Sequence, residues 1–247
     1  MRFSVMTQNL FNTELWEIRG ESAKAFFTLY QPDILCLQEV RPQTLGELDK
    51  VLVGYERIQD SFIGWTEEGT IYFKSSLFSL AEKGEVDLDM PEVNRRLFWA
   101  RLAVNGTGRT LFISTVHLTW QGNADEIRTG MPYRNREAKT AADALVHLIR
   151  PNEPGILCGD FNDPYHPARI ISEVTGMTEI FYALGLQGPL TFPCAQVSEE
   201  IYLSESIDKM MFTPGPLRAV LAASPQYYYR HNAPSDHWSV EGVFELS

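Results

Sequence analysis

The sequence contains few cysteines, and none of them has the spacing of a soft-metal site. Its 247 residues include three cysteines, which cannot all pair with one another. Cys36 and Cys158 lie in short apolar runs, where a free thiol packs as a small hydrophobic group. No CxxC or Cys/His spacing is present. The cysteines therefore exclude a paired-cysteine framework and argue against a zinc site.

Long apolar runs and interdomain linkers are also missing. The longest apolar runs are too short to span a bilayer, and no Gly/Ser/Pro-rich linker, repeat or low-complexity tract occurs. With 44% hydrophobic residues the chain can bury a large core, so we expect a single domain over residues 1–247. The amino-terminal residues lack the apolar segment and cleavage site of a signal peptide, so we expect a cytoplasmic protein that does not bind membranes. Nothing in the sequence indicates an obligate protein partner.

The sequence also lacks any block of Lys and Arg. Its formal net charge is −11, with 17 basic and 20 acidic residues before position 151 and 4 and 12 from there on. Such a surface repels polyanions, so general affinity for nucleic acids is disfavoured unless a local basic rim or a bound cation reverses the field. The candidates for phosphate contact are Arg41, Arg95, Arg96 and Arg134, although each alone is typical of a surface ion pair. We therefore expect about one to three phosphate contacts and no extended nucleic-acid interface.

Apolar periodicity predicts alternating strands and helices over most of the chain. Period-two alternation and short apolar runs predict strands at 2–10, 34–37, 55–58, 70–73, 77–80, 97–104, 111–118, 155–158, 206–212 and 239–246. Helical spacing predicts helices at 14–30, 42–52, 132–149 and 167–174. Residues 177–203 follow neither period. The sequence thus indicates an α/β protein with hairpins in its middle part.

A polar cluster, Gly159–Asp163, follows the apolar run that ends at Cys158. While the chain stays extended, Asp160 and Asn162 share one face and Phe161 points to the other. An Asp at the end of a buried strand can orient a nucleophile or hold a metal, and a neighbouring Asn can donate to a developing anion. A turn with an Asx cap before the next helix accounts for the pentapeptide equally well.

Five further positions at or near strand ends carry residues that handle metals or protons. They are Asn9, Glu39, His117, Asp208 and the pair Asp236–His237. Each alone has a plain structural explanation as a solvated strand end, an ion pair or a core histidine. Together they supply hard oxygen ligands without thiolates, which suit Mg²⁺ or Mn²⁺. The chemistry they indicate is metal-assisted phosphoryl hydrolysis.

The predicted helix that begins at Pro132 carries Tyr133, Arg134 and Glu137 in its opening turns. A helix amino terminus attracts phosphate, so Tyr133 and Arg134 are candidate substrate-binding residues. Arg134 and Glu137 are also three positions apart, which is the spacing of an ordinary surface pair.

These candidate residues lie in motifs that resemble those of the endonuclease/exonuclease/phosphatase superfamily, in the same order over nearly the whole chain. The motifs are Thr7-Gln8-Asn9-Leu10, Leu37-Gln38-Glu39-Val40, Thr115-Val116-His117-Leu118, Gly159-Asp160-Phe161-Asn162, Ser206-Ile207-Asp208 and Ser235-Asp236-His237. The resemblance implies a four-layer α/β sandwich, in which two mixed β-sheets pack together between outer helices and form one active site at their edges. It also implies a metal-dependent phosphoric-ester hydrolase of the phosphodiesterase and nuclease class.

The resemblance also implies roles for individual residues. Glu39 is similar to the main Mg²⁺ ligand of the family, with Asn9 and Asp236 helping to hold the metal and its waters. Asp160 would orient or deprotonate the attacking water, and Asn162 would hydrogen-bond the phosphate.

Two histidines complete the site that the resemblance implies. His237 would be polarised by Asp208 and would stabilise or protonate oxygens of the pentavalent intermediate. His117 would bind a nonbridging oxygen, and Glu68 resembles an acidic residue that some members place near that histidine.

The resemblance leaves the substrate open, because relatives cleave DNA, RNA, sphingomyelin, inositol phosphates and protein–DNA linkages. Residues 30–33, 37–40 and 234–238 are most similar to the tyrosyl-DNA phosphodiesterase branch, although Pro164 stands where that branch usually has an arginine. Tyr133 and Arg134 loosely match a tyrosine or arginine that contacts phosphate in several branches. We expect hydrolysis of a nucleic-acid end or a small phosphodiester. The alternatives are a non-specific endonuclease, a sphingomyelinase-like enzyme and a catalytically silent binding module of the same fold.

Overall fold

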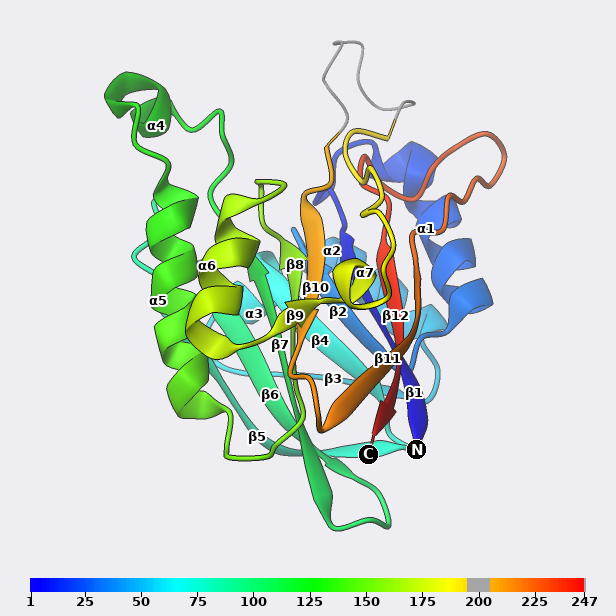
Figure 1. Cartoon of the computed structure of the whole chain (residues 1–247). Helices are drawn as coiled ribbons and strands as arrows, with labels where there is room; N and C mark the ends of the chain where they lie inside the picture. Colours follow the sequence, from blue (N-terminus) through cyan, green and yellow to red (C-terminus); the bar gives the residue numbers. More distant parts are fainter. Residues whose placement is uncertain (195–204, 247) are drawn as a thin grey trace.

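The computed structural model describes residues 1–194 and 205–246, in which two six-stranded sheets pack face to face (Figure 1). The strand order is β11-β12-β1-β2-β4-β3 in the first sheet and β5-β6-β7-β8-β10-β9 in the second. The strands of the first sheet are β1 (Arg2–Asn9), β2 (Ile34–Gln38), β3 (Tyr55–Arg57), β4 (Gly69–Lys74), β11 (Leu217–Ala223) and β12 (Val240–Leu246). Those of the second are β5 (Phe78–Val86), β6 (Leu97–Val104), β7 (Arg109–His117), β8 (Gly155–Asp160), β9 (Thr178–Glu179) and β10 (Asp208–Phe212).

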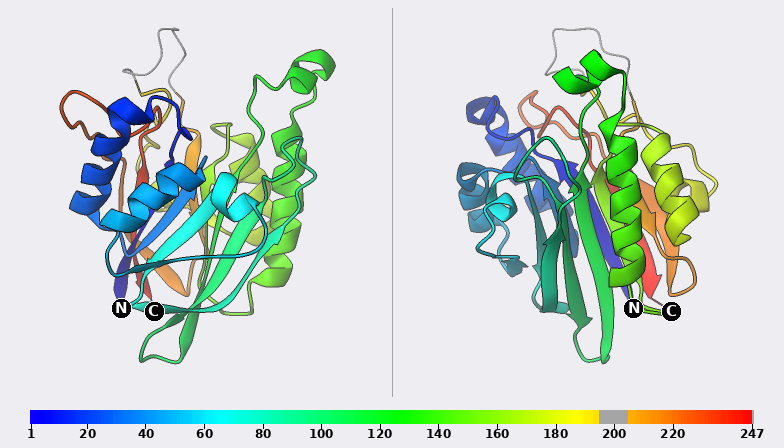
Figure 2. Two further views of the ribbon diagram at one scale, coloured as in Figure 1. Left: turned by 180° about the vertical axis from the view of Figure 1, so that it is seen from behind. Right: turned by 90° about the vertical axis from the view of Figure 1, so that its left-hand side faces the viewer.

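Helices cover the outer face of each sheet (Figure 2). The helices on the first sheet are α1 (Trp16–Tyr30) and α2 (Pro42–Val51), and those on the second are α5 (Tyr133–Leu148) and α6 (His166–Thr175). The shorter helices are α3 (Gly64–Glu67), α4 (Ala124–Thr129) and α7 (Ile180–Ala183). This is a four-layer α/β sandwich, so the predicted fold class is confirmed. Among residues 1–194 and 205–246, no helix is long and apolar enough to cross a membrane.

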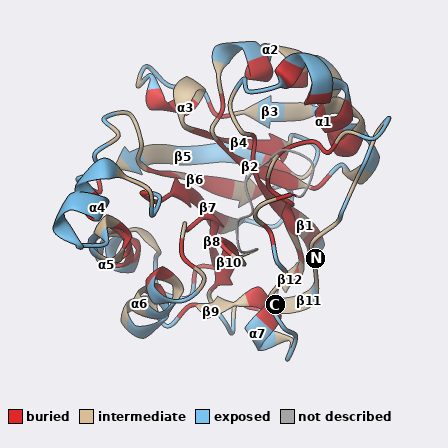
Figure 3. Ribbon diagram, turned by 90° about the horizontal axis from the view of Figure 1, so that it is seen from above, coloured by how far each residue is buried: buried red, intermediate tan, exposed pale blue. Residues whose placement is uncertain are grey.

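Three apolar layers hold these four structural layers together, because successive side chains of a strand point to opposite faces. In β1, Val5 packs between the sheets and Met6 packs against α1 and α2. In β8, Ile156 and Cys158 pack between the sheets and Leu157 packs against α5 and α6. Figure 3 shows this burial in the strands and on the inner sides of the helices.

The same alternation places polar residues between the sheets at one end of the sandwich. Asn9, His117 and Asp160 are the last residues of their strands, and Asp208 is the first residue of β10. Because β7 and β8 are parallel and β10 is antiparallel to β8, the register pairs both His117 and Asp208 with Asp160. The sheet geometry therefore brings four of the predicted site residues together without any contribution from a loop.

A buried glutamine connects the two sheets next to this polar end. Nε2 of Gln38 donates to Oγ1 of Thr7 at 3.0 Å within its own sheet and to Oγ1 of Thr115 at 2.7 Å in the opposite sheet. Gln38 is 1% exposed, so these hydrogen bonds do not compete with bulk water. Thr7 and Thr115 each lie two residues before a polar strand end, and the bridge thus sets the positions of both.

Most predicted strands and helices agree with the structure to within a few residues, but several elements were missed. β11 was not predicted, because it is an edge strand in which only Leu217 is buried and no apolar alternation marks it. β5 was predicted to end at 80 but continues to Val86, since its mostly exposed residues pair with β6. Short α3, α4, β9 and α7 were also missed. Part of the unassigned stretch 177–203, from 195 onward, lies outside the described residues.

Gly159 is required where β8 approaches β7. Its φ is 143°, and a Cβ at this position would lie 1.9 Å from the carbonyl oxygen of Val116. We expect Gly159→Ala to lower the free energy of unfolding by about 3 kcal/mol, measured by urea denaturation. Gly46 is the matched control, because it is exposed within α2 and its added Cβ would touch no heavy atom of the described chain within 4 Å. Gly46→Ala should raise stability by about 0.5–1 kcal/mol.

Candidate active site

A cavity of about 310 Å³ opens at the polar end of the two sheets. The predicted residues that line it are Glu39, His117, Asp160, Asn162, Asp236 and His237. Asn9 and Asp208 lie behind this lining, in hydrogen-bond contact with Asp160 and His237 respectively. The structure therefore brings together the predicted catalytic and metal-binding residues from both sheets.

Asp160 lies at the centre of the site and is 1% exposed. Its Oδ1 accepts a hydrogen bond from the backbone N–H of Asn162 at 2.9 Å, and its Oδ2 accepts one from Nδ2 of Asn9 at 3.0 Å. Oδ2 also lies 3.4 Å from Nε2 of His117 and 3.7 Å from Nε2 of His237. One carboxylate oxygen thus faces both imidazoles of the site.

Burial raises the pKa of Asp160 to about 7, and the nearby carboxylate of Asp208 adds to this increase. The positive charge of His237 and the hydrogen bonds from Asn162 and Asn9 oppose the increase, but burial outweighs them. A carboxylate with a pKa near neutrality can take up a proton at physiological pH, which is what a general base must do.

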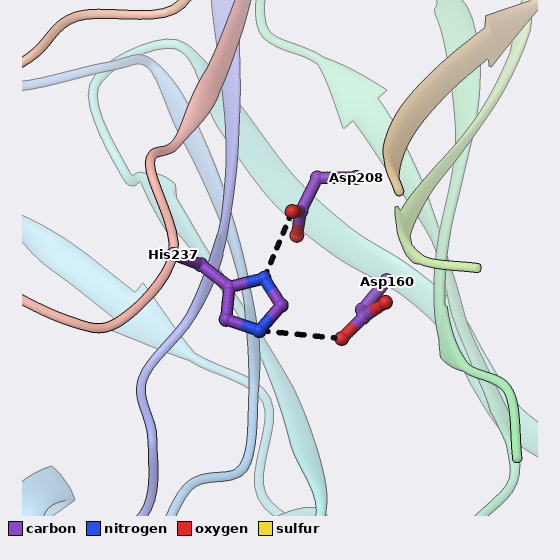
Figure 4. A group of neighbouring side chains, drawn as sticks. All are labelled: Asp160, Asp208 and His237. Carbon is purple, nitrogen blue, oxygen red and sulfur yellow. Dashed lines mark hydrogen bonds and ion pairs between the residues drawn. The ribbon is translucent and has the colours of Figure 1, made fainter. Parts of the chain in front are cut away.

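His237 and Asp208 form a buried hydrogen-bonded pair (Figure 4). Nδ1 of the imidazole lies 2.9 Å from Oδ2 of Asp208. Burial alone would lower the pKa of His237, but the carboxylates of Asp208, Asp236 and Asp160 together raise it well above its ordinary value. The raised pKa favours the protonated ring, in which Nδ1 donates to Asp208 and Nε2–H faces Asp160 and the cavity.

The pKa of His117 is shifted in the opposite direction. Burial lowers the pKa of His117 well below its ordinary value, and the positive charges of Arg95, His237 and Arg41 lower it further. Nε2 lies 3.4 Å from Asp160 and 3.9 Å from Oε1 of Glu39. A neutral imidazole can donate one hydrogen bond to a substrate oxygen without adding charge.

Glu39 follows β2 and takes a left-handed backbone conformation, with φ at 50°. Two side-chain amides hold its carboxylate, since Asn9 donates to Oε1 at 3.1 Å and Asn12 donates to Oε2 at 2.9 Å. Asp236 lines the same cavity, and burial raises its pKa, with a further contribution from the negative charge of Glu39. Two carboxylates thus face one cavity and repel each other.

The amide of Asn9, which was expected to help hold the metal, is fully engaged in hydrogen bonds. Its Oδ1 accepts the backbone N–H of Phe11 at 2.9 Å, while its Nδ2 donates to both Glu39 and Asp160. The amide therefore presents its donor side to the two carboxylates and its acceptor side to the backbone. In this arrangement Asn9 orients the acidic groups and does not direct an oxygen toward a metal.

The residues best suited to a divalent cation are Glu39 and Asp236. Oxygen atoms on hard carboxylates suit Mg²⁺, and neither group forms an ion pair with Lys or Arg in the described part of the chain. Asp160, Asp208 and His237 also place ligand atoms within 4.8 Å of one another. That group fits less well, because the protonated imidazole already bonds Asp208 and has no lone pair for a metal.

Tyr133 and Arg134 do not line the cavity, contrary to the expectation that they bind the substrate. The start of α5 does attract an anion, but the anion is Glu126, which accepts the backbone N–H of Tyr133 at 2.6 Å. Nη1 of Arg134 donates to both carboxylate oxygens of Glu126, at 2.8 and 2.6 Å, and Nε lies 3.5 Å from Asp163. The amino terminus of α5 and the guanidinium of Arg134, which the sequence indicated as phosphate-binding groups, therefore bind carboxylates of the protein itself.

Glu68 does not line the cavity but contacts an arginine that does. Its Oε2 accepts a hydrogen bond from Nε of Arg95 at 3.2 Å, and Arg95 lines the cavity. Arg41 lines it as well, and its Nη1 donates to the backbone oxygens of Val40, at 2.7 Å, and Glu67. These two fixed guanidinium groups supply a local basic rim on an acidic protein.

Asp160 and Asn162 both face the cavity and Phe161 faces the opposite core layer, as predicted, although β8 ends at Asp160 and the chain does not stay extended to Asn162. The φ of Asn162 is 49°, a left-handed conformation that Asn tolerates. Its Nδ2 donates to the carbonyl of Leu118 at 2.8 Å, and the side chain still lines the cavity. Phe161 is fully buried in the core beside α5 and α6.

Sequence reasoning missed several cavity residues. They are Phe11, Asn12, Glu92, Trp120 and Phe192. Trp120 follows β7 three residues after its last member, so attention to residues just beyond strand ends would have found it. Its indole is 56% exposed and packs over Gly122, where an added Cβ would lie 2.0 Å from the ring. No local sequence signal marks Asn12.

The fold and the cavity define a class of protein, a four-layer α/β sandwich with a buried aspartate and two buried histidines in a cavity at one end of its two sheets. The chain belongs to the Endonuclease/Exonuclease/phosphatase family, whose model matches residues 6–237. It is a hydrolase acting on phosphoric esters, as the sequence predicted.

Several solved structures share the fold. Danio rerio TDP2 complexed with single strand DNA product is 18% identical, with a TM-score of 0.82 and 99% of each chain covered. The mannosyl-6-phosphatase Bt3783 of Bacteroides thetaiotaomicron VPI-5482 is 20% identical, with a TM-score of 0.78 and 99% of each chain covered. A probable RNA exonuclease of Schizosaccharomyces pombe is 28% identical over 160 residues, which are 60% of this chain and 31% of the relative. The chain thus spans about a third of that curated relative.

Asp160→Asn should stabilise the metal-free protein at alkaline pH. Folding raises the pKa of Asp160 from 3.8 to about 7, so the folded state favours the protonated form and the charged form is destabilising. That penalty is absent below about pH 4 and grows until about pH 7. Urea denaturation in EDTA should show a gain for the variant near zero at about pH 4 and about 2–4 kcal/mol at about pH 8. A gain independent of pH would contradict the raised pKa.

Proposed function

We propose that the protein is a Mg²⁺- or Mn²⁺-dependent phosphodiesterase that hydrolyses a nucleic-acid end or a small phosphodiester. The observation that carries this proposal is the position of Asp160, a buried carboxylate with a pKa of about 7 that opens onto the cavity. It lies between an imidazole kept neutral and one kept charged, so groups for accepting and donating protons converge on one point.

The proposed reaction is an in-line displacement by water. Oδ2 of Asp160 orients the water and takes its proton while the water oxygen forms a bond to phosphorus and the leaving oxygen departs. The His237 imidazolium, held by Asp208, presents Nε2–H to the negative charge that grows on the phosphoryl oxygens. The leaving oxygen takes this proton as its bond to phosphorus breaks, and the neutral His237 then recovers a proton from solvent or from Asp160.

The oxygens that do not react need donors of their own. His117 supplies Nε2–H, and Asn162 lines the same wall with its amide. Arg41 and Arg95 add positive charge at the rim without direct contact to Asp160, and Glu68 holds Arg95 in place. Together these donors and positive charges are sufficient to bind one phosphate group.

Glu39 and Asp236 are the residues that would hold the divalent cation. When bound there, the cation neutralises charge on the phosphoryl oxygens. Asn9 and Asn12 keep the Glu39 carboxylate directed into the cavity through hydrogen bonds to separate oxygens. The mutual repulsion of Glu39 and Asp236 is relieved by a cation, which favours binding.

The substrate we propose is compact and carries a flat group. The cavity holds about 310 Å³, and the exposed Trp120 at its mouth offers an aromatic face for stacking. Danio rerio TDP2, which has the same fold, is complexed with a single strand DNA product, and this supports a nucleic-acid end. A net charge of −11 disfavours binding along a duplex.

The other candidate functions have less support. A catalytically silent binding module would not need the complete set of buried acid, base and cation-binding carboxylates seen here. A non-specific endonuclease needs many phosphate contacts, whereas Arg41 and Arg95 are the Lys or Arg residues among the described cavity lining. No feature of the cavity specifically favours a sphingomyelin-like substrate.

Glu39→Gln should weaken the affinity for Mg²⁺ and lower turnover together. The amide keeps the hydrogen-bonding shape but loses the negative charge, so half-maximal activity should need about ten to a hundred times more Mg²⁺. Activity should recover partly at high Mg²⁺ in assays of a short oligonucleotide. Loss of turnover with an unchanged Mg²⁺ dependence would show that Glu39 is not a metal ligand. Full activity of the wild-type protein in excess EDTA would show that the reaction needs no metal.

The salt dependence of activity should be shallow. With about one to three phosphate contacts, the logarithm of kcat/KM should fall with the logarithm of salt concentration with a slope of about −1 to −3. The assay compares a 5′-blocked oligonucleotide, a supercoiled plasmid and a small diester such as bis-p-nitrophenyl phosphate over one salt series. Rapid plasmid cleavage with a slope of many units would instead support the alternative function of a non-specific endonuclease.

A further inference from the structure

Arg19 of α1 is a buried arginine whose guanidinium binds only backbone oxygens among the described residues. Nε donates to the carbonyl of Glu14 at 2.6 Å, and Nη1 donates to that of Pro234 at 2.8 Å. Nη2 donates to the carbonyls of Phe11 at 2.7 Å and Asn12 at 3.2 Å. Arg19 is 2% exposed and forms no ion pair with a carboxylate of the described chain. Such a buried cation must have a structural or functional reason.

The first segment that Arg19 holds is strained. Phe11, Asn12 and Leu15 all have left-handed backbones, with φ of 53°, 37° and 51°. This conformation is unfavourable for residues with a Cβ, so the segment needs contacts that impose it. The guanidinium supplies them, since it also lies 5.4 Å from the ring centre of Phe11 and 5.1 Å from that of Trp16. The strained segment carries Asn12, whose Nδ2 donates to Oε2 of Glu39.

The second segment leads to the other cavity carboxylate. Pro234 lies two residues before Asp236, and the hydroxyl of Ser235 between them donates to the carbonyl of Asn9 at 2.7 Å. One guanidinium therefore ties the segment that orients Glu39 to the segment that carries Asp236. These segments are more than 200 positions apart, since the bond from Arg19 to Pro234 spans 215 residues.

We propose that Arg19 is a positioning residue that sets the separation and direction of the Glu39 and Asp236 carboxylates, and hence the affinity for a divalent cation. The inference rests on the proposed function, because it assigns these two residues to the cation. The fixed fork of an arginine suits this task, since it binds several carbonyls in set directions.

Charge alone predicts the opposite effect, and this makes the proposal testable. Burial lowers the pKa of Arg19 to about 10, so the group is still charged at neutral pH, and it lies within electrostatic range of Asp236 and Glu39. A nearby cation repels Mg²⁺, so removing it would strengthen Mg²⁺ binding if geometry did not matter. Positioning predicts weaker binding.

The test measures binding of Mn²⁺ and Mg²⁺ by titration calorimetry, with no substrate present. Arg19→Gln, which removes the charge and the fork, should weaken cation binding about ten- to a hundredfold, the range typical when support for a metal ligand is lost. Arg19→Lys keeps the charge, and it should weaken binding by a smaller factor because an ammonium cannot reach all four carbonyls. The double variant Asn12→Ala/Arg19→Lys should weaken cation binding by less than the product of the two factors measured for the single variants.

Arg101→Gln is the matched control. Arg101 is equally buried, at 3% exposed, but it binds Glu153 at 2.7 Å and the carbonyl of Leu148, away from the cavity. It should lower thermal stability and leave the cation affinity as in wild type.

The outcomes separate the inference from the proposed function. Unchanged or tighter cation binding in a folded Arg19→Gln variant would overturn the positioning role. If that variant does not fold, wild-type affinity in Arg19→Lys would overturn it instead. A wild-type protein that neither binds the cations nor cleaves phosphodiesters would refute the proposed function itself.

Discussion

The burial of the Asp160 carboxylate between the two sheets is the constraint on which the rest of the site depends. A carboxylate at 1% exposure is unstable as an anion unless donors surround it. Asn9 and the backbone of Asn162 provide hydrogen bonds, and the charged ring of His237 lies near by. Asp208 in turn keeps that ring charged, and the positive rim helps to keep His117 neutral. The pKa of each group thus follows from its own burial and from the few charges placed around it.

Much of the fold and the centre of the site could be predicted, because both follow from local periodicity. Asn9, His117 and Asp160 end apolar strands, and the period of two places each of them between the sheets. Residues whose partners are distant in sequence could not be assigned in this way. Arg134 binds Glu126 across a turn that no pattern marks, and Arg19 binds a carbonyl 215 positions away. The edge strand β11 was missed for another reason, since six of its seven residues are apolar and show no alternation with polar residues.

The site also divides into a part built on strands and a part built on loops. The residues proposed to move protons are Asp160, at a strand end, and His237, just before β12, and His117, proposed to donate a hydrogen bond, also ends a strand. Trp120, Arg41 and the strained Phe11 segment lie beyond strand ends. Loops tolerate substitution better than paired strands, so relatives can recognise different esters with one reaction centre. This division is consistent with the names of the similar proteins, which include a probable RNA exonuclease and a mannosyl-6-phosphatase.

The hydrogen bonds of Gln38 have a consequence for sliding motions between the sheets. Glu39 extends from the first sheet and Asp160 belongs to the second, so their distance depends on how far one sheet is displaced along the other. A shift by a single strand position is about 3.3 Å, which is enough to separate the cation from the attacking water. Gln38 opposes such shear because it bonds Thr7 and Thr115 at once. Changes in the packing between the sheets, far from the cavity, would therefore alter activity by changing the alignment of Glu39 with Asp160.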